Sequence, residues 1–249
     1  MNNRRLHNRV AVIAGVSGDL ESTLSYHLAE RGCHVVVGFK NKEKLRLLEK
    51  KIDTFRVGVV TQQIEISDED SVKKLVLAAL DHFARIDFLI YLGEPRLQSS
   101  WQDSPFDNLN QTKQLTGLKN ILLINEILPH MQLRGSGHIV NISAIESETL
   151  MNFGPDNHIA KTVFSGSTDT FVKDLRQNGI YVSIIYPYKY KLHHQENYNA
   201  RYGEKVSKAV IKTLSSRKPE VSVPRFLPNI FSFLNLFLLK LNSRYANSV

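Results

Sequence analysis

The sequence contains one cysteine, Cys33, which excludes an internal disulfide framework and a cysteine-rich metal site. It also lacks the apolar core of a signal peptide, because the N-terminus reads MNNRRLHNRV. No run reaches the roughly 18 apolar residues that span a bilayer as a helix. We therefore expect a soluble protein of the cytoplasm that holds no metal.

Glycine (13) and proline (8) are too scarce in 249 residues for a collagen-like or low-complexity chain. Apolar residues make up 42% and charged residues 22%, which is the composition of an ordinary globular protein. Lysine and arginine number 32 against 24 acidic residues, and the net charge is +8. That excess favours acidic partners without identifying one, and we expect no nucleic-acid role.

Short apolar runs alternate with segments of helical periodicity along most of the chain. The expected strands cover residues 10–14, 34–38, 56–66, 88–92, 138–143, 181–186 and 221–223. The expected helices cover 19–31, 42–51, 68–83, 115–132, 157–177 and 204–215. This order predicts an α/β fold with one Rossmann-like, doubly wound parallel sheet of about seven strands and helices on both faces. We expect residues 1–249 to form a single domain.

Two segments fall outside this alternation. Residues 188–203 are polar and irregular, and we expect them to form a lid over the carboxyl edge of the sheet, where such folds bind ligands. Residues 226–249 form a C-terminal tail that contains the apolar stretch FLPNIFSFLNLFLLKL. The tail could cap the core, dock on a protein partner, or make a peripheral contact with a membrane.

Several stretches, in order, resemble the short-chain dehydrogenase/reductase family over about residues 8–225. They are NRVAVI at 8–13, EISD at 65–68, DFLI at 87–90, LPHM at 128–131, GSGHIVNIS at 135–143 and GIYV at 179–182. The resemblance implies a Rossmann-like domain, a nicotinamide dinucleotide and carbonyl–alcohol chemistry. It also implies a homo- or hetero-oligomer that pairs through the helices at 115–132 and 157–177.

The cofactor motif of the resembled family is incomplete here. Its phosphate loop reads T-G-x-x-x-G-x-G, and of its three glycines Gly15 is kept, whereas Asp19 and Glu21 stand at the other two positions. Glycine there lets the backbone approach the pyrophosphate, and a carboxylate adds repulsion. We therefore expect no bound cofactor. If a dinucleotide does bind, Lys40 favours NADP(H) over NAD(H), and Ile66 falls in the turn that meets the adenine in the family.

The catalytic group implied by the resemblance is also largely replaced. Thr116 stands at the asparagine position, Ala144 at the serine position and Asn157 at the tyrosine position, whereas Lys161 is kept. An asparagine amide does not titrate near neutral pH, so Asn157 cannot exchange the substrate proton. A methyl group at Ala144 cannot polarise a carbonyl. His158 is the nearest substitute, although a helix turns it about 100° from Asn157.

These replacements suggest a degenerate family member whose redox activity is lost or impaired. Such a chain could act as a partner subunit, or its cleft could bind a small molecule for a non-redox step, such as a cyclisation or isomerisation, in a biosynthetic pathway. The alternative is an NADPH-dependent oxidoreductase, a ketone or 3-oxoacyl reductase, with displaced catalytic groups.

Overall fold

A computed structural model describes residues 5–15, 19–39, 41–92, 122–142, 168–187 and 196–223. Seven strands in these ranges form one sheet in the order β3-β2-β1-β4-β5-β6-β7, and each neighbouring pair is parallel. The strands are β1 (Val10–Gly15), β2 (His34–Phe39), β3 (Val59–Gln63), β4 (Phe88–Leu92), β5 (Gly137–Ile142), β6 (Ile180–Pro187) and β7 (Glu220–Val223). The predicted doubly wound α/β sheet is confirmed.

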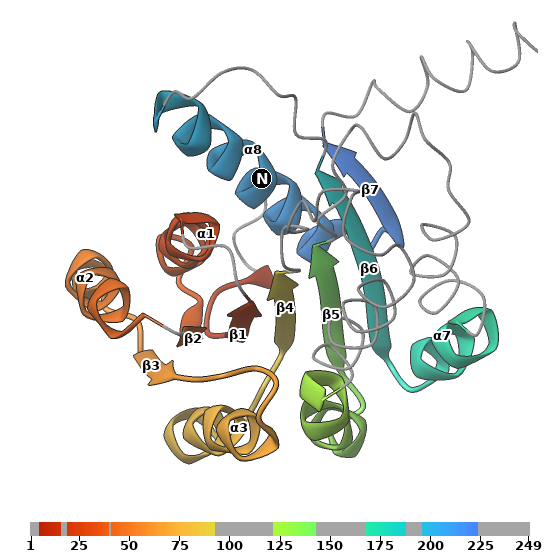
Figure 1. The fold of residues 1–249 in the computed structure, drawn as a ribbon. Helices are drawn as coiled ribbons and strands as arrows, with labels where there is room; N and C mark the ends of the chain where they lie inside the picture. The colour runs from red at the N-terminus through yellow and green to blue at the C-terminus, as the bar shows by residue number, and fades with distance from the viewer. Residues whose placement is uncertain are drawn as a thin grey trace, which may run out of the picture.

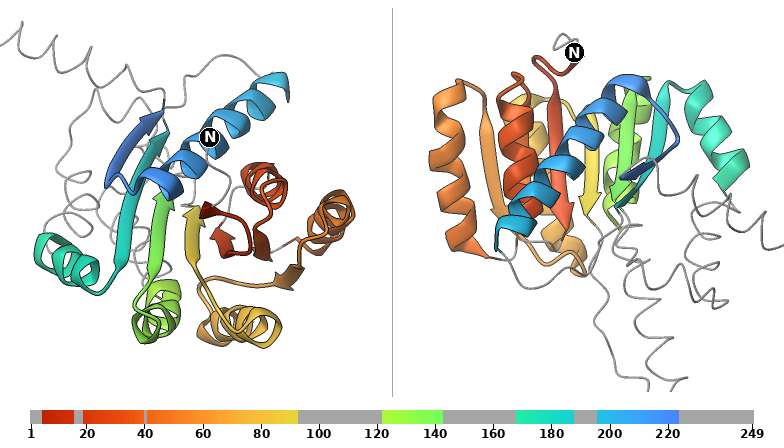
Figure 2. Two further views of the ribbon diagram at one scale, coloured as in Figure 1. Left: turned by 180° about the vertical axis from the view of Figure 1, so that it is seen from behind. Right: turned by 90° about the horizontal axis from the view of Figure 1, so that it is seen from above.

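Helices cover both faces of this sheet (Figure 1). One face carries α1 (Asp19–Ala29), α2 (Lys42–Ile52) and α8 (Glu196–Ser216). The other carries α3 (Glu69–Phe83), a helix at 122–133, and α7 (Thr168–Gln177). Figure 2 shows the strands running in one direction, with the N-terminus at the edge where they begin.

The core consists of two layers, one on each side of the sheet. Along β1, Ala11 and Ile13 pack with α1, α2 and α8, whereas Val10, Val12 and Ala14 pack with α3 and the helix at 122–133. Successive strand residues point to opposite faces, so a strand covered on both sides is apolar throughout. This explains why all six residues of β1 are buried and why the run was recognisable in the sequence.

Most element boundaries agree with the prediction. The third strand is the one that falls furthest short of its predicted length. The run at 56–66 forms a strand only over Val59–Gln63. Before it, a short 3-10 helix (Asp53–Phe55) ends at Arg56 in a left-handed conformation with φ 54°. After it, the chain turns into α3, and Asp68 caps that helix by accepting hydrogen bonds from the Ser71 N–H at 3.1 Å and the Ser71 hydroxyl at 2.7 Å. Asp68 is thus the N-cap of α3.

The last helix differs most from the prediction. Helix α8 begins at Glu196 instead of residue 204, so residues 196–203 of the expected irregular lid are helical. Tertiary packing supports these turns, because Tyr202 packs against the core and Gly203 is buried beside Thr23 of α1. Residues 188–195 and the tail at 226–249 lie outside the described residues. Among the helices that the structure describes, none is both long and apolar enough to cross a membrane.

The two helices expected to pair subunits are described in part, over 122–133 and Thr168–Gln177. In the first, Leu123, Ile127 and Met131 face the core, which leaves the opposite side of the helix to solvent or a partner. Association through these helices stays a prediction.

Candidate functional site

The connections of the sheet change direction at β1. From β1 the chain crosses to β2 and then β3 on one side, and from β3 it returns to β4 on the other side of β1. The carboxyl ends of β1 and β4 therefore flank a crevice, which is where open α/β sheets bind ligands. Residues in register at this point are Gly38 with Ala14, and Gly15 with Leu92.

Gly15 stands at the carboxyl end of β1, beside the crevice, and the structure shows why it must be glycine. A Cβ on this residue would lie 2.6 Å from the Cβ of Leu92 and still closer to the Leu92 carbonyl oxygen. The backbone also has φ 155°, a conformation that side chains disfavour. The Gly15 backbone thus packs directly against Leu92, and the wall of the crevice at the end of β1 carries no side chain of its own.

Helix α1 begins four residues beyond Gly15, at Asp19, and its N-terminus lies at the same edge of the sheet. Its first turn directs backbone N–H groups and the positive end of the helix dipole toward this edge. Glu21 is 1% exposed, so its carboxylate is buried in the protein. The repulsion expected between Glu21 and a pyrophosphate stays a prediction.

The turn after β3 lies at the same edge of the sheet, because β3 runs parallel to β2 and β1. The Ser67 hydroxyl donates to the Glu65 carboxylate at 2.9 Å, and the Asp68 N–H donates to the Glu65 carbonyl at 2.9 Å. Ile66 is only 3% exposed and packs with the apolar layer that contains Leu75. The side chain of Ile66 therefore anchors the turn, and its backbone is the part that a ligand could meet.

Six of the predicted site residues lie outside the described residues, namely Lys40, Thr116, Ala144, Asn157, His158 and Lys161. Their roles stay predictions, although the described strands fix where two of them attach. Lys40 directly follows β2, and Ala144 comes two residues after β5. Both strands end at the same edge as Gly15 because the sheet is parallel.

The carboxyl end of β5 carries a polar group that the sequence pattern did not single out. The Oδ1 atom of Asn141 is buried and has no hydrogen-bond partner among the described residues. Asn141 pairs in register with Tyr91 on β4, and Tyr91 is 2% exposed. A buried amide oxygen next to this edge is available to a donor from a segment or ligand that covers it.

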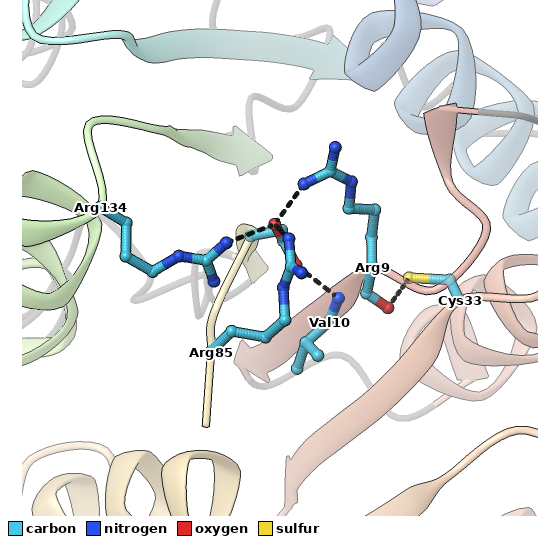
Figure 3. Close-up of polar contacts among 6 residues, drawn as sticks. Arg9, Val10, Cys33, Arg85 and Arg134 are labelled. Carbon is cyan, nitrogen blue, oxygen red and sulfur yellow. Dashed lines mark hydrogen bonds and ion pairs between the residues drawn. The ribbon is translucent and has the colours of Figure 1, made fainter. Parts of the chain in front are cut away.

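The opposite edge holds a charged cluster that sequence analysis also missed. Asp87, immediately before β4, accepts hydrogen bonds from Arg9 Nη1 at 2.9 Å, Val10 N at 2.9 Å, and Arg85 Nε at 2.8 Å and Nη2 at 2.5 Å. Arg134 Nη2 lies 3.8 Å from the same carboxylate (Figure 3). Burial alone would raise the pKa of Asp87, but these bonds outweigh it and hold the pKa below its usual value.

This cluster joins the starts of neighbouring strands. The sequence carried one signal of this cluster. Arg9 directly precedes β1 and Asp87 directly precedes β4, and both strands were predicted from the sequence. Cys33 completes the group, since its thiol lies 3.2 Å from the Arg9 carbonyl oxygen. Burial, followed by the charge of Asp87, raises the pKa of the Cys33 thiol far above its usual value. Cys33 is therefore an inert core residue.

A second buried polar group at this edge involves His138. Its Nε2 lies 2.8 Å from the Ser183 hydroxyl, and that hydroxyl donates to the Lys218 carbonyl at 2.6 Å. Burial, aided by the charge of Arg217, lowers the pKa of His138 to about 4. His138 is therefore neutral near pH 7 and acts in packing between β5, β6 and the end of α8.

No group of three or more histidine, cysteine, aspartate or glutamate side chains in the described ranges is arranged to hold a metal ion.

Comparison with known proteins gives a family match. The model of the family described as short chain dehydrogenase matches residues 9–203. An uncharacterized oxidoreductase of Staphylococcus saprophyticus is 25% identical over 183 residues, which cover 73% of this chain and 78% of that protein. The glycine betaine reductase ATRR of Emericella nidulans is 29% identical over 141 residues, which cover 56% of this chain but 11% of that protein.

Two solved structures show the same fold. A metagenomic short-chain oxidoreductase in complex with NADP superposes with TM-score 0.64 at 19% identity, covering 88% of this chain and 97% of the other. The NADH-dependent reductase A1-R′, complexed with NAD, gives TM-score 0.70 at 14% identity, covering 88% of this chain and 96% of the other.

These structures overturn one expectation from the sequence. The prediction that no cofactor is bound is wrong, because proteins of this fold are solved with NADP and with NAD in place. The physical argument for it was also incomplete, since one of the two carboxylates that it invoked is buried in the core.

Proposed function

Because the chain belongs to the short-chain dehydrogenase family, we propose that it is an oxidoreductase-type protein that binds NADP(H) in the crevice between β1 and β4. The observation that carries this proposal is the contact of Gly15 with Leu92. Because a side chain at residue 15 would clash with Leu92, the wall of the crevice at the end of β1 carries no side chain of its own where the sheet changes direction. Such a wall lets a pyrophosphate approach the backbone and the start of α1.

Each part of the dinucleotide has a matching element of this chain. The N–H groups in the first turn of α1 would hold the pyrophosphate, and the turn at 65–67 would border the adenine. Lys40, directly after β2, would meet a 2′-phosphate, and this favours NADP(H) over NAD(H). The bound nicotinamide supplies a hydride, and the protein must supply its position and a proton.

This chain departs from its family in the side chains that would supply the substrate proton. Asn157 stands where a tyrosine would donate the proton, and Ala144 stands where a serine would polarise the carbonyl. A positioned general acid contributes typically 10²–10⁴-fold to the rate. We therefore propose that the chain binds cofactor but reduces ordinary ketones slowly, with proton transfer and not cofactor binding as the impaired step.

A calorimetric titration with NADPH and with NADH tests the binding half of this proposal. NADPH should bind saturably, and more tightly than NADH, to the wild type. Lys40→Glu should remove the preference for NADPH, because a carboxylate repels the 2′-phosphate and accepts a hydrogen bond from a 2′-hydroxyl. Lys74→Glu, at an exposed position of α3, is the matched control and should leave the preference unchanged. The proposal is contradicted if neither NADPH nor NADH binds.

A further inference from the structure

Because the seven strands are parallel, their amino ends meet at one edge, opposite the cofactor crevice. We call this surface the amino edge and define it by the segments that lead into the strands. They are residues 5–9, 30–33, 53–58, 84–87, 134–136, 178–179 and 217–219. All seven segments belong to the described residues, and the right-hand view of Figure 2 shows this edge beside the N-terminus.

The amino edge concentrates positive charge. Its 27 residues include eight arginine or lysine residues and three acidic residues, so they carry +5 of the chain's net +8. The basic residues are Arg5, Arg9, Arg31, Arg56, Arg85, Arg134, Arg217 and Lys218. Six of the seven segments contribute at least one of them. Most are exposed, and the others are half-buried, so the field of this edge reaches solvent.

The acidic residues of the edge neutralise only part of this charge, and one of them, Glu30, pairs with Arg31 at 2.7 Å. Asp87 is 5% exposed and lies beneath three guanidinium groups, those of Arg9, Arg85 and Arg134, which are 31–44% exposed (Figure 3). One carboxylate shared by three cations leaves two positive charges in excess at this point. Arg134 is the most loosely held, because its 3.8 Å separation exceeds hydrogen-bond length. Its donors can therefore turn to an external anion.

A large apolar side chain stands beside these cations. Leu133 is 87% exposed and immediately precedes Arg134 at the end of the helix at 122–133. The aromatic ring of Tyr181, by contrast, is covered by Arg217, whose guanidinium carbon lies 4.0 Å from the ring centroid. Single-stranded nucleic acid needs open aromatic faces on which bases can stack. A bilayer surface needs spread basic residues and an apolar side chain that can enter it.

We propose that the amino edge is a peripheral docking surface for an anionic phospholipid bilayer. Arg134, Arg56 and the cations at 217–218 contact lipid phosphates, and Leu133 enters the headgroup region. The cofactor crevice then faces away from the membrane, because it lies at the opposite edge of the same sheet. The docking surface is independent of any redox activity and uses none of the residues of the crevice.

Vesicle co-sedimentation of the full chain tests this proposal. The probes are vesicles of phosphatidylcholine alone and vesicles of phosphatidylcholine with phosphatidylserine, at low and at high salt. The edge variant combines Arg134→Gln with Arg56→Gln, and the matched control combines Arg46→Gln with Lys74→Gln, which are exposed cations of α2 and α3. A third variant, Leu133→Ser, tests the apolar contribution separately.

The wild type and the control variant should sediment with the anionic vesicles at low salt, and salt should release both. The edge variant should bind at least tenfold more weakly, since each basic residue at such a surface strengthens binding roughly fivefold. Leu133→Ser should bind several-fold more weakly.

The proposal is overturned if the edge variant binds like the control, or if the wild type does not sediment with anionic vesicles. Equal binding to the neutral vesicles would assign membrane contact to the apolar segment at 226–241. Edge-dependent binding of an RNA oligonucleotide without vesicle binding would assign the surface to nucleic acid.

Discussion

Gly15 and Leu92 meet at the carboxyl ends of β1 and β4 so closely that no Cβ fits between them. Gly15→Ala should therefore push these strand ends apart and distort the crevice that they flank. We expect a loss of about 1–3 kcal/mol in the free energy of unfolding, the usual cost of forcing an atom into a packed site. NADPH affinity should fall by more than tenfold. Urea denaturation and calorimetric titration measure the two effects.

Gly203→Ala provides the contrast for this experiment. A Cβ at Gly203 would lie 3.4 Å from the Thr23 hydroxyl, which is an ordinary contact distance. Alanine is the better helix former by about 1 kcal/mol, so this variant of α8 should be as stable as the wild type or more so. If Gly15→Ala and Gly203→Ala have the same effect, the close approach at the crevice is not what requires glycine.

Asp87 should account for a large part of the stability of the amino edge. In Asp87→Asn, three arginines lose their shared counter-ion, and we expect a loss of about 3 kcal/mol in the free energy of unfolding. Asp174→Asn, at an exposed site on α7, should change it by less than about 0.5 kcal/mol. Chemical denaturation at neutral pH distinguishes the two. An equally small change for both would show that the arginines contribute nothing through Asp87.

The sign of the pKa shift gives Asp87 a pH signature. Its folded pKa is lowered, so its contribution to stability is present above the unfolded value of about 3.9 and is lost as pH falls through the folded pKa. The stability difference between wild type and Asp87→Asn should therefore shrink as pH falls below about 4. Denaturation curves across that range check this. A difference that does not depend on pH would mean that the charge of Asp87 is irrelevant.

His138 should lower the stability of the folded protein as the pH falls, over a higher pH range than Asp87 does. Its folded pKa of about 4 lies below the unfolded value of about 6.5. As pH falls between these values, the unfolded chain takes up a proton that the folded chain does not, and about 3 kcal/mol of stability is lost. His138→Gln should flatten the decline between pH 6.5 and 4. The control His82→Gln, on the exposed end of α3, should retain it. A decline of equal slope in both variants would contradict the assignment to His138.

Restoring the missing acid should restore part of the chemistry if the cofactor binds. The double variant Asn157→Tyr with Ala144→Ser should reduce an activated ketone with NADPH at least tenfold faster than the wild type, because a general acid is returned four residues before Lys161. The control variant Asn157→Phe with Ala144→Ser adds the ring without the hydroxyl and should stay near the wild-type rate. Equal rates for the two variants would mean that proton transfer at residue 157 is not the impaired step.

The fold was predictable because β1 and β4 are continuous apolar runs, which a parallel sheet covered on both faces requires. The start of α8 was not, because Tyr202 and Gly203 are held helical by contacts with distant parts of the chain. Local periodicity carries no information about such contacts.

The parts of the candidate site that depend on backbone geometry were predictable. The parts that depend on the surroundings of a side chain were less so. Gly15 was recognised from the phosphate-loop pattern of the resembled family, and the structure shows that a side chain there would clash with Leu92. The acid at Glu21 was assigned to the ligand side, whereas the structure buries it. Burial of a single acid depends on its neighbours in space, and a sequence pattern does not state them. The cluster at Asp87 was missed for the same reason.

Hydrogen–deuterium exchange of the full chain with and without NADPH tests the central claim most directly, because it locates the dinucleotide on the fold. The account predicts that NADPH slows exchange in the first turn of α1, at residues 19–22, and in the turn at 64–68. Exchange at the amino edge, in residues 30–33 and 217–219, should stay unchanged. No change at saturating NADPH, or slower exchange confined to the amino edge, would contradict a cofactor crevice between β1 and β4.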